Sequence, residues 1–124
     1  MNNTNDMKID METGEQIIDT WTVIYSSPNG KKYNGKLTVT NKRLLYDAKF
    51  DVSAKGQIEE ALFIKWGSEE FVVIPKNRII KVEVSKKFFA KKVILTLDNN
   101  SEHVFNYGML NIDPVAKAIM KNNN

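Results

Sequence analysis

The sequence predicts an all-β fold completed by one C-terminal helix. Three observations lead to this prediction: apolar and polar residues alternate in several short segments, clusters of turn-forming residues separate these segments, and helical spacing of apolar residues occurs only near the C-terminus. About seven or eight strands in succession, with no helix between them, are typical of an antiparallel barrel or sandwich. We expect a closed or nearly closed barrel, which leaves few strand edges exposed.

Composition is that of a single domain. The chain has 124 residues, of which 42% are hydrophobic and 10% aromatic, enough for one packed core. A net charge of +3 favours no particular partner by itself. The lack of cysteine excludes disulfides, thiol nucleophiles and Cys-ligated zinc, and it favours the cytoplasm. Because no apolar run approaches the ~20 residues of a membrane span, and the N-terminus lacks the pattern of a signal peptide, we expect a soluble cytoplasmic protein.

The best-specified element is a β-hairpin over residues 35–46 and the positions that follow. On both arms, apolar residues occupy every second position, and the residues between them are mostly polar. The apolar positions are Leu37, Val39, Leu44, Tyr46, Ala48 and Phe50. Such a period of two is typical of half-buried strands. Asn41 lies at the turn, where it tolerates a left-handed backbone and its side chain can bond the local main chain. The segment Thr40-Asn41-Lys42 can therefore turn without a glycine.

Further strands are predicted on both sides of this hairpin, over residues 17–25, 58–66, 71–74, 80–85, 93–97 and 102–107. The segment 58–66 also fits a short amphipathic helix. Pro75 has no N–H for a ladder and therefore marks the end of the strand before it. In the segment 80–85, Ile80, Val82 and Val84 alternate with polar residues, which predicts one apolar face and one solvated face.

The two ends of the chain differ from the strand-rich middle. Residues 1–13 are polar and are interpreted as a flexible leader, and residues 122–124 as a disordered tail. Between them lies one domain, residues 14–121. Near its end, Asp113 is predicted to cap a short helix whose first position is Pro114. The apolar residues that follow have helical spacing: Val115, Ala118 and Ile119.

Four segments, in order, carry a resemblance to a known family: Gly14-Glu15, the hairpin Gly35-Lys36-Leu37-Thr38-Val39-Thr40-Asn41-Lys42-Arg43-Leu44, Ile74-Pro75, and Ile79-Ile80-Lys81-Val82-Glu83. Over nearly the whole chain this pattern resembles the GRAM branch of the pleckstrin-homology (PH) superfold. The resemblance implies a PH-like antiparallel barrel of about seven or eight strands, in two near-orthogonal sheets, capped by a short α-helix. It also implies a non-enzymatic binding module without a cofactor, because such domains hold lipids, peptides or proteins on loops and edges.

A basic and aromatic segment is the first candidate binding site. Two lysine pairs bracket two phenylalanines at the turn between two predicted strands: Lys86, Lys87, Phe88, Phe89, Lys91 and Lys92. This arrangement suits an anionic membrane, because lysines near such a surface contribute roughly 1 kcal/mol each and aromatic rings enter the headgroup region. In the alternative interpretation, the rings pack on the barrel wall, and the lysines keep the hairpin soluble and block edge pairing.

A second basic segment, Lys31 and Lys32, lies on the loop between the first two predicted strands. By the family resemblance, this loop is where PH domains typically build phosphoinositide sites from spaced lysines and arginines. Here it offers lysines but no arginine, so the match is weak. Whether this loop and the segment 85–92 share one end of the barrel is left open by the sequence.

Nucleic acid and catalysis are both disfavoured. The chain is only mildly basic, and most of its tryptophans and tyrosines fall in strand runs that suggest core positions. His103 is the single histidine. A Ser-His-Asp set can be written from Ser101, His103 and Asp98, but all three fall on one turn and its strand, so we expect an ordinary exposed histidine. No metal site and no phosphate-binding glycine loop are predicted.

The sequence therefore predicts a non-enzymatic adaptor that recognises a protein or peptide partner. An extended peptide could add as a strand at a sheet edge, through main-chain hydrogen bonds. The alternative is an anionic-lipid-binding module that is peripheral at a membrane surface through residues 85–92. The sequence gives no indication of the oligomeric state.

Overall fold

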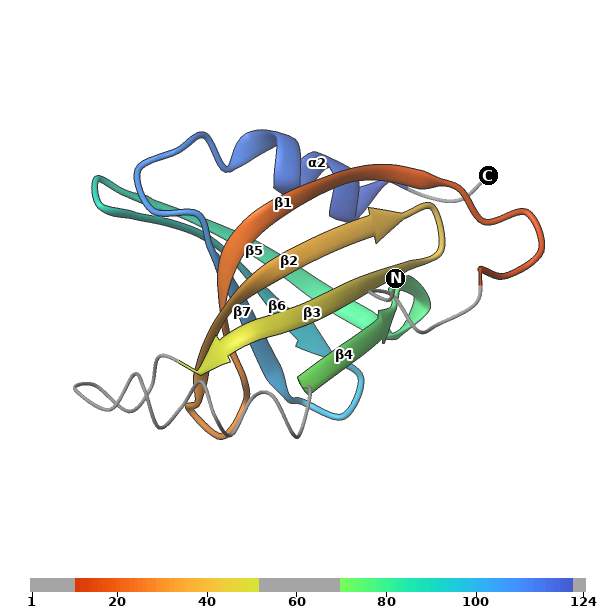
Figure 1. Ribbon diagram of the computed structural model, residues 1–124, viewed down its shortest axis with the longest axis horizontal. Coiled ribbons are helices and arrows are strands. Elements are labelled where there is room, and N and C mark those ends of the chain that lie inside the picture. The colour runs from red at the N-terminus through yellow and green to blue at the C-terminus, as the bar shows by residue number, and fades with distance from the viewer. Residues whose placement is uncertain (1–10, 52–69, 122–124) are drawn as a thin grey trace, which may run out of the picture.

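The computed structural model describes residues 11–51 and 70–121 (Figure 1). It confirms the all-β fold with one C-terminal helix. In chain order the elements are β1 (Ile17–Ser26), β2 (Lys32–Thr40), β3 (Arg43–Asp51), β4 (Glu70–Pro75), η1 (Lys76–Arg78), β5 (Ile79–Lys87), β6 (Ala90–Leu97), β7 (Glu102–Asn106) and α2 (Asp113–Met120). The strand or helix predicted at 58–66, the tail at 122–124 and most of the leader lie outside the described residues.

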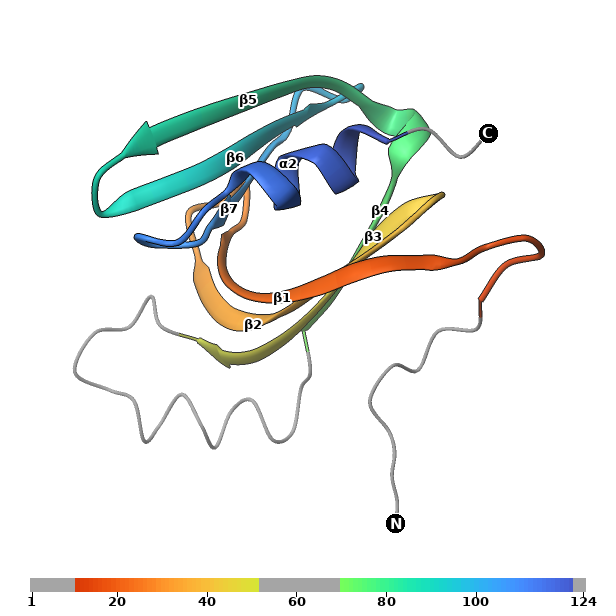
Figure 2. The ribbon, with the colours of Figure 1, turned by 90° about the horizontal axis from the view of Figure 1, so that it is seen from above.

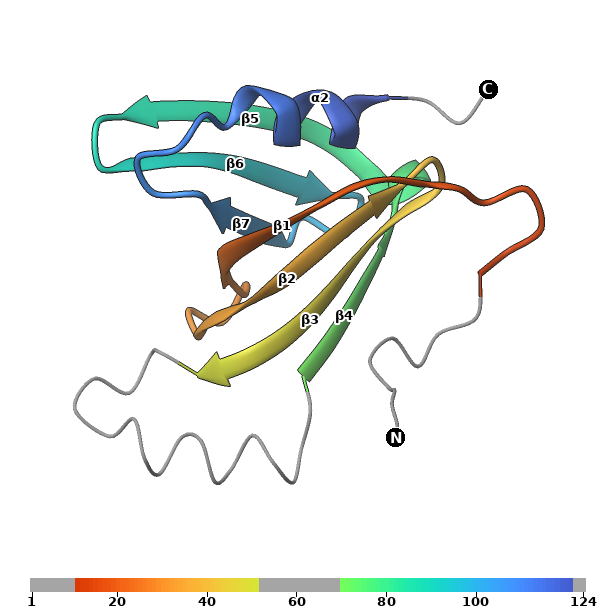
Figure 3. The ribbon, with the colours of Figure 1, turned by 45° about the horizontal axis from the view of Figure 1, so that its top comes forward.

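The seven strands form one antiparallel sheet in the order β4-β3-β2-β1-β7-β6-β5. The sheet folds over on itself, so that β1–β4 make a first wall and β5–β7 a second wall (Figures 2 and 3). Strand β1 joins the walls, because it pairs with β2 along most of its length and with β7 through Ile24, Tyr25 and Ser26. Helix α2 lies between the two walls on their open side (Figure 2).

The sheet does not close into the barrel that the sequence predicts. Its terminal strands are β4 and β5, and no ladder joins them within the described residues. The reason lies at their junction. Pro75, the last residue of β4, has no N–H to donate, and the 3₁₀ turn η1 redirects the chain before β5 begins. The sheet therefore has two ends, with α2 covering the space between the walls.

The core fills this space. It includes side chains from both walls, such as Leu37, Tyr46, Leu95 and Phe105. Helix α2 adds a buried face of Val115, Ala116, Ala118 and Ile119. The predicted helix is therefore confirmed, with Pro114 in its first turn. Asp113, however, is not its cap: Ile112 holds the N-cap position, and no side chain caps the helix there.

The predicted β2–β3 hairpin is confirmed, with Val39 opposite Leu44 across the turn. The alternating apolar residues of this hairpin are buried in the core as expected. The side chain of Phe50 is not among those that the structure describes. Leu45 belongs to the other face and was expected among polar residues, yet it is also buried. A β-bulge between Asn34 and Gly35 bends the hairpin, and a Cβ at Gly35 would collide with the backbone of Asp47 and Ala48. Only glycine fits this close approach.

Asn41 does more than turn the hairpin. Its side-chain amide donates to the carbonyl of Gly14 (3.1 Å), while its carbonyl oxygen accepts from the backbone N–H of Gln16 (2.8 Å). Its own backbone N–H donates to the carbonyl of Gln16 (3.0 Å). The Gly14-Glu15 and Thr40-Asn41-Lys42-Arg43 segments are therefore neighbours in space. Glu12 also hydrogen bonds with Glu15, so this part of the predicted leader is held against the domain.

Strand β5 departs from the predicted alternation. A bulge lies between Ile79 and Lys81. It shifts the side chains by one position, so that Ile79 and Val82 pack against the core while Ile80 is 61% exposed. Val84 is also exposed. The prediction that Ile80, Val82 and Val84 share a buried face is therefore wrong, and β5 carries apolar side chains on its surface.

Candidate functional site

The β5–β6 hairpin ends in a two-residue turn made of Phe88 and Phe89, with Lys87 opposite Ala90 in register. Phe88 is 68% exposed and Phe89 is 72% exposed. The two rings contact each other edge to face, with their centroids 4.5 Å apart. The alternative in which these rings pack on the wall is therefore wrong. The hairpin continues past the last residue of β7, Asn106, so among the described residues no strand pairs with its end beyond Lys92 (Figure 3).

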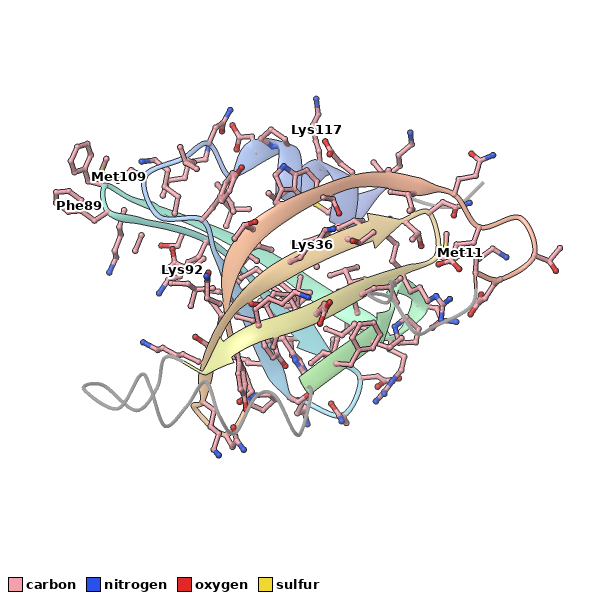
Figure 4. All side chains as sticks on the ribbon, viewed as in Figure 1. Met11, Lys36, Phe89, Lys92, Met109 and Lys117 are labelled. Carbon is pink, nitrogen blue, oxygen red and sulfur yellow. The ribbon has the colours of Figure 1, made fainter. Side chains whose placement is uncertain are left out.

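A second loop joins this end of the molecule. Residues 107–112 connect β7 to α2, and they expose Met109 and Leu110 by 58% each. Figure 4 shows Met109 close to Phe89 at the end of the hairpin. We refer to the four side chains as the apolar tip: Phe88, Phe89, Met109 and Leu110. The sequence reasoning missed the last two, and the only signal was a pair of large apolar residues directly after Gly108, outside any periodic pattern.

Lys91 holds the two parts of the apolar tip together. Its backbone N–H donates to the carbonyl of Gly108 (2.8 Å), and its backbone carbonyl accepts from Tyr107 (2.9 Å). Its ammonium donates to the carbonyls of Phe88 (3.1 Å) and Met109 (3.5 Å), and it also lies 5.4 Å from the centroid of the Phe88 ring. The hairpin end and the loop 107–112 therefore behave as one surface.

The four lysines surround the apolar tip on both faces of the hairpin. Lys86 lies opposite Lys91, so these two share one face, and Lys87 and Lys92 take the other. Like charges directly opposite each other on a sheet cost stability. One of them is partly compensated, because the Lys86 ammonium lies 2.9 Å from the Asp113 carboxylate. The arrangement concentrates positive charge around exposed apolar side chains.

Lys31 and Lys32 are not part of this surface. Asn106 of β7 pairs with Lys92 on one side and with Ile24 on the other. From Lys92, β6 runs back towards its first residue, Ala90, and so towards the apolar tip. In the opposite direction β1 leads to Ser26, which pairs with Lys32. Figure 1 shows the β1–β2 loop and the β5–β6 hairpin well apart, so the structure separates the two predicted basic segments.

His103 is buried rather than exposed, which corrects the sequence-based expectation. It belongs to the inward row of β7 together with Phe105, and it lies opposite Leu95. Its Nδ1 is 2.7 Å from the Tyr25 hydroxyl, and its Nε2 is 3.1 Å from the Ser101 hydroxyl. Burial, with a smaller contribution from the charge of Arg78, lowers the pKa of His103.

The third member of the Ser-His-Asp set faces another partner. Asp98 accepts two hydrogen bonds from the Arg78 guanidinium, at 3.0 Å from Nε and 2.8 Å from Nη2. The ring nitrogens of His103 bond a tyrosine and a serine instead. These residues tie the β6–β7 turn to η1 and to the aromatic core.

In the part of the chain that the structure describes, no helix is long and apolar enough to cross a bilayer. Comparison with protein families and with curated proteins finds no match for this chain. Among solved structures, the C-terminal domain of an unknown protein from Leishmania infantum is similar, with a TM-score of 0.63 and 16% sequence identity. The alignment covers 90% of this chain and 86% of that chain. At this identity, the likeness shows a shared fold alone.

Proposed function

We propose that this protein is a non-enzymatic, PH-like targeting module that docks on anionic membrane surfaces through its apolar tip and the surrounding lysines. The observation that carries the proposal is the exposure of Phe88 and Phe89 at the free end of a hairpin with lysines on both faces. The sequence alone favoured a protein or peptide partner. The exposure of both rings supports placing the membrane surface first in this proposal.

Two features support the assignment to a PH-like fold of the GRAM type. Strand β1 takes part in both walls, and a C-terminal helix covers the open side between them. The segments that carry the family resemblance also contact each other, since Asn41 hydrogen bonds Gly14 and Gln16. The unpaired junction between β4 and β5 is a departure from a closed barrel.

The chemistry of the tip fits a charged bilayer surface. Each large apolar side chain that leaves water contributes up to about 1.5–3 kcal/mol, and each lysine near an anionic surface roughly 1 kcal/mol. Because the lysines lie on both faces of the hairpin, an upright hairpin places its rings among the headgroups and keeps ammonium groups at the anionic surface on both sides. Together, the apolar and lysine contributions predict reversible membrane binding that weakens as salt screens the charges.

Co-sedimentation with vesicles tests the proposal. Purified protein is mixed with neutral phosphatidylcholine vesicles, or with vesicles that also contain phosphatidylserine, at low and at physiological salt. We expect binding only to the anionic vesicles, more at low salt. It should be lost in the Phe88→Ser/Phe89→Ser variant and kept in Ile80→Ser, which removes a similarly exposed apolar side chain from β5 of the same hairpin.

A second pair of variants tests the charges. Lys86→Glu/Lys87→Glu reverses two lysines beside the tip, and Lys31→Glu/Lys32→Glu reverses two at the other end of the sheet. Both pairs change the net charge equally. We expect only the first pair to abolish binding. Binding that ignores salt, or that the two pairs weaken alike, would contradict the proposal.

A peptide partner remains the second candidate, because the outer edge of β5 is unpaired within the described residues. This edge strand also exposes Ile80 and Val84, and an extended peptide could add to it as a further strand. Hydrogen exchange distinguishes the two functions. A peptide partner would protect the β5 backbone amides, and its capture would survive Phe88→Ser/Phe89→Ser, whereas vesicles would protect residues 87–91 and 107–110.

A further inference from the structure

A pocket of about 560 Å³ with a mixed polar and apolar lining lies at the junction of β4 and β5. Its walls come from the β2–β3 turn, from η1 and the strand ends beside it, and from the end of α2. The pocket is remote from the apolar tip. Strand β5 begins in the pocket wall at Ile79 and ends beside the tip at Lys87, and nine extended residues span roughly 25–30 Å. The pocket therefore faces away from a membrane to which the tip is bound.

The charged residues in the lining of this pocket are predominantly cationic. Four of its residues carry a positive charge, and Glu12 is the one acid among the lining residues. Arg43 is already neutralised, because it pairs with the buried Glu15. The other three cations come from three separate segments: Lys42, Lys76 and Lys121. None of the salt bridges among the described residues involves these three lysines.

Lys76 is held in place by the end of α2. Its ammonium donates to the backbone carbonyls of Ala118 and Lys121, at 2.8 Å each, beside the helix C-terminus. The Ala118 carbonyl also accepts from the backbone N–H of Lys121 (3.3 Å). An ammonium has three donors, so one remains for a ligand. Burial, with a smaller contribution from the charge of Lys121, lowers the pKa of Lys76. Lys42, Lys76 and Lys121 face the single lining acid Glu12, so an anion would relieve the repulsion among these lysines.

We propose that this pocket binds a small, soluble, multiply charged phosphate anion, held by Lys42, Lys76 and Lys121. Lysine ammonium groups act as point charges toward phosphate oxygens. The side-chain amide of Asn77, also in the lining, can donate a further hydrogen bond. The volume lies within the range of small-ligand sites. This binding is separate from membrane docking and does not depend on it.

The test uses sodium tripolyphosphate as the probe, at constant ionic strength adjusted with sodium chloride, without vesicles. Backbone amide shifts are followed by two-dimensional NMR. We expect saturable shifts confined to the β2–β3 turn, η1 and the end of α2. In Lys42→Glu/Lys121→Glu the affinity should fall at least tenfold. The matched control Lys31→Glu/Lys117→Glu makes the same change in net charge outside the pocket lining and should bind like the wild type. Lys117 points outward from α2 (Figure 4).

Two further variants keep the outcome decisive. If charge reversal unfolds the protein, Lys42→Gln/Lys121→Gln replaces it, with weaker binding again expected. Phe88→Ser/Phe89→Ser should bind tripolyphosphate normally, so that failure of the pocket and failure of the membrane site can be told apart. Equal weakening in the pocket and control variants, or shifts spread over all surface lysines, would show non-specific attraction and overturn the proposal.

Discussion

The Glu15 carboxylate accepts two hydrogen bonds from the Arg43 guanidinium, 2.8 Å from Nε and 3.0 Å from Nη2, and the Glu15 side chain is completely buried. The Thr40 hydroxyl donates a third hydrogen bond to the same carboxylate (2.6 Å) and accepts from the backbone N–H of Arg43 (2.9 Å). The pair thus fastens the segment before β1 to the turn between β2 and β3. This contact gives a physical reason for the Gly14-Glu15 segment and the Thr40-Asn41-Lys42-Arg43 segment to occur in the same sequence.

Removing the charge of Glu15 should destabilise the protein strongly. In Glu15→Gln the Arg43 guanidinium stays in its buried position without the Glu15 carboxylate, and breaking a buried pair in this way typically costs about 3–5 kcal/mol. Urea unfolding measures the loss in the free energy of unfolding. The control is Glu12→Gln, because Glu12 is half exposed and lies 3.7 Å from Arg43. We expect less than about 1 kcal/mol there, and equal losses in both variants would contradict a special role for Glu15.

The same pair predicts an acid limb of stability. Burial by itself raises the pKa of Glu15, but hydrogen bonds from Arg43, from the Glu12 backbone and from Thr40, with the charge of Arg43, lower this pKa from 4.5 to about 2. The folded state therefore holds the carboxylate ionised at pH values where the unfolded chain binds a proton. Its stabilisation is complete above pH 4.5 and is lost as the pH falls from 4.5 towards 2.

Urea unfolding at a series of pH values measures this limb. The difference in unfolding free energy between the wild type and Glu15→Gln should shrink steadily over that interval. A difference that stays constant down to pH 2 would show that the carboxylate is not held ionised by the fold.

Gly35→Ala should be destabilising, since the new Cβ would meet the backbone of Asp47 and Ala48 across the bulge. Backbone atoms cannot move aside as a flexible side chain can, and overpacking of this kind costs about 1–3 kcal/mol. Thermal unfolding gives the loss. Lys36→Ala, at an exposed site on the same strand, is the control and should change stability by less than about 0.5 kcal/mol. A Gly35→Ala variant as stable as this control would mean that β2 and β3 can separate at the bulge.

Local pattern was sufficient to predict most of the fold. The alternation around Leu37 and Leu44 predicted a hairpin with the correct inward row, and the change of period after Asp113 predicted α2. Both signals depend only on residues close in sequence. The bulge at Ile80 and the burial of Leu45 have no such signal, because they depend on which backbone lies opposite in the sheet.

The candidate site was only half predictable for the same reason. Residue types identified the segment around Phe88 and Phe89, but their exposure depends on where the neighbouring strand stops, which is at Asn106. Met109 is brought to them by the contacts of Lys91 with the loop 107–112. Likewise, the separation of Lys32 from the tip follows from register across four strands, which no local pattern encodes.

His103 predicts a second, milder dependence on pH. Burial, and to a lesser degree the charge of Arg78, lower the pKa of His103 below its ordinary value of 6.5, so the folded state favours the neutral ring that bonds Tyr25. The stabilisation is complete above pH 6.5 and is lost as the pH falls from there through the lowered pKa of the folded state. Because the chain has a single histidine, one imidazole signal in a proton NMR titration reports this pKa directly. We expect it below 6.5 in the wild type and closer to 6.5 in urea, and a titration at or above 6.5 in the folded protein would show that the fold does not disfavour the charged ring.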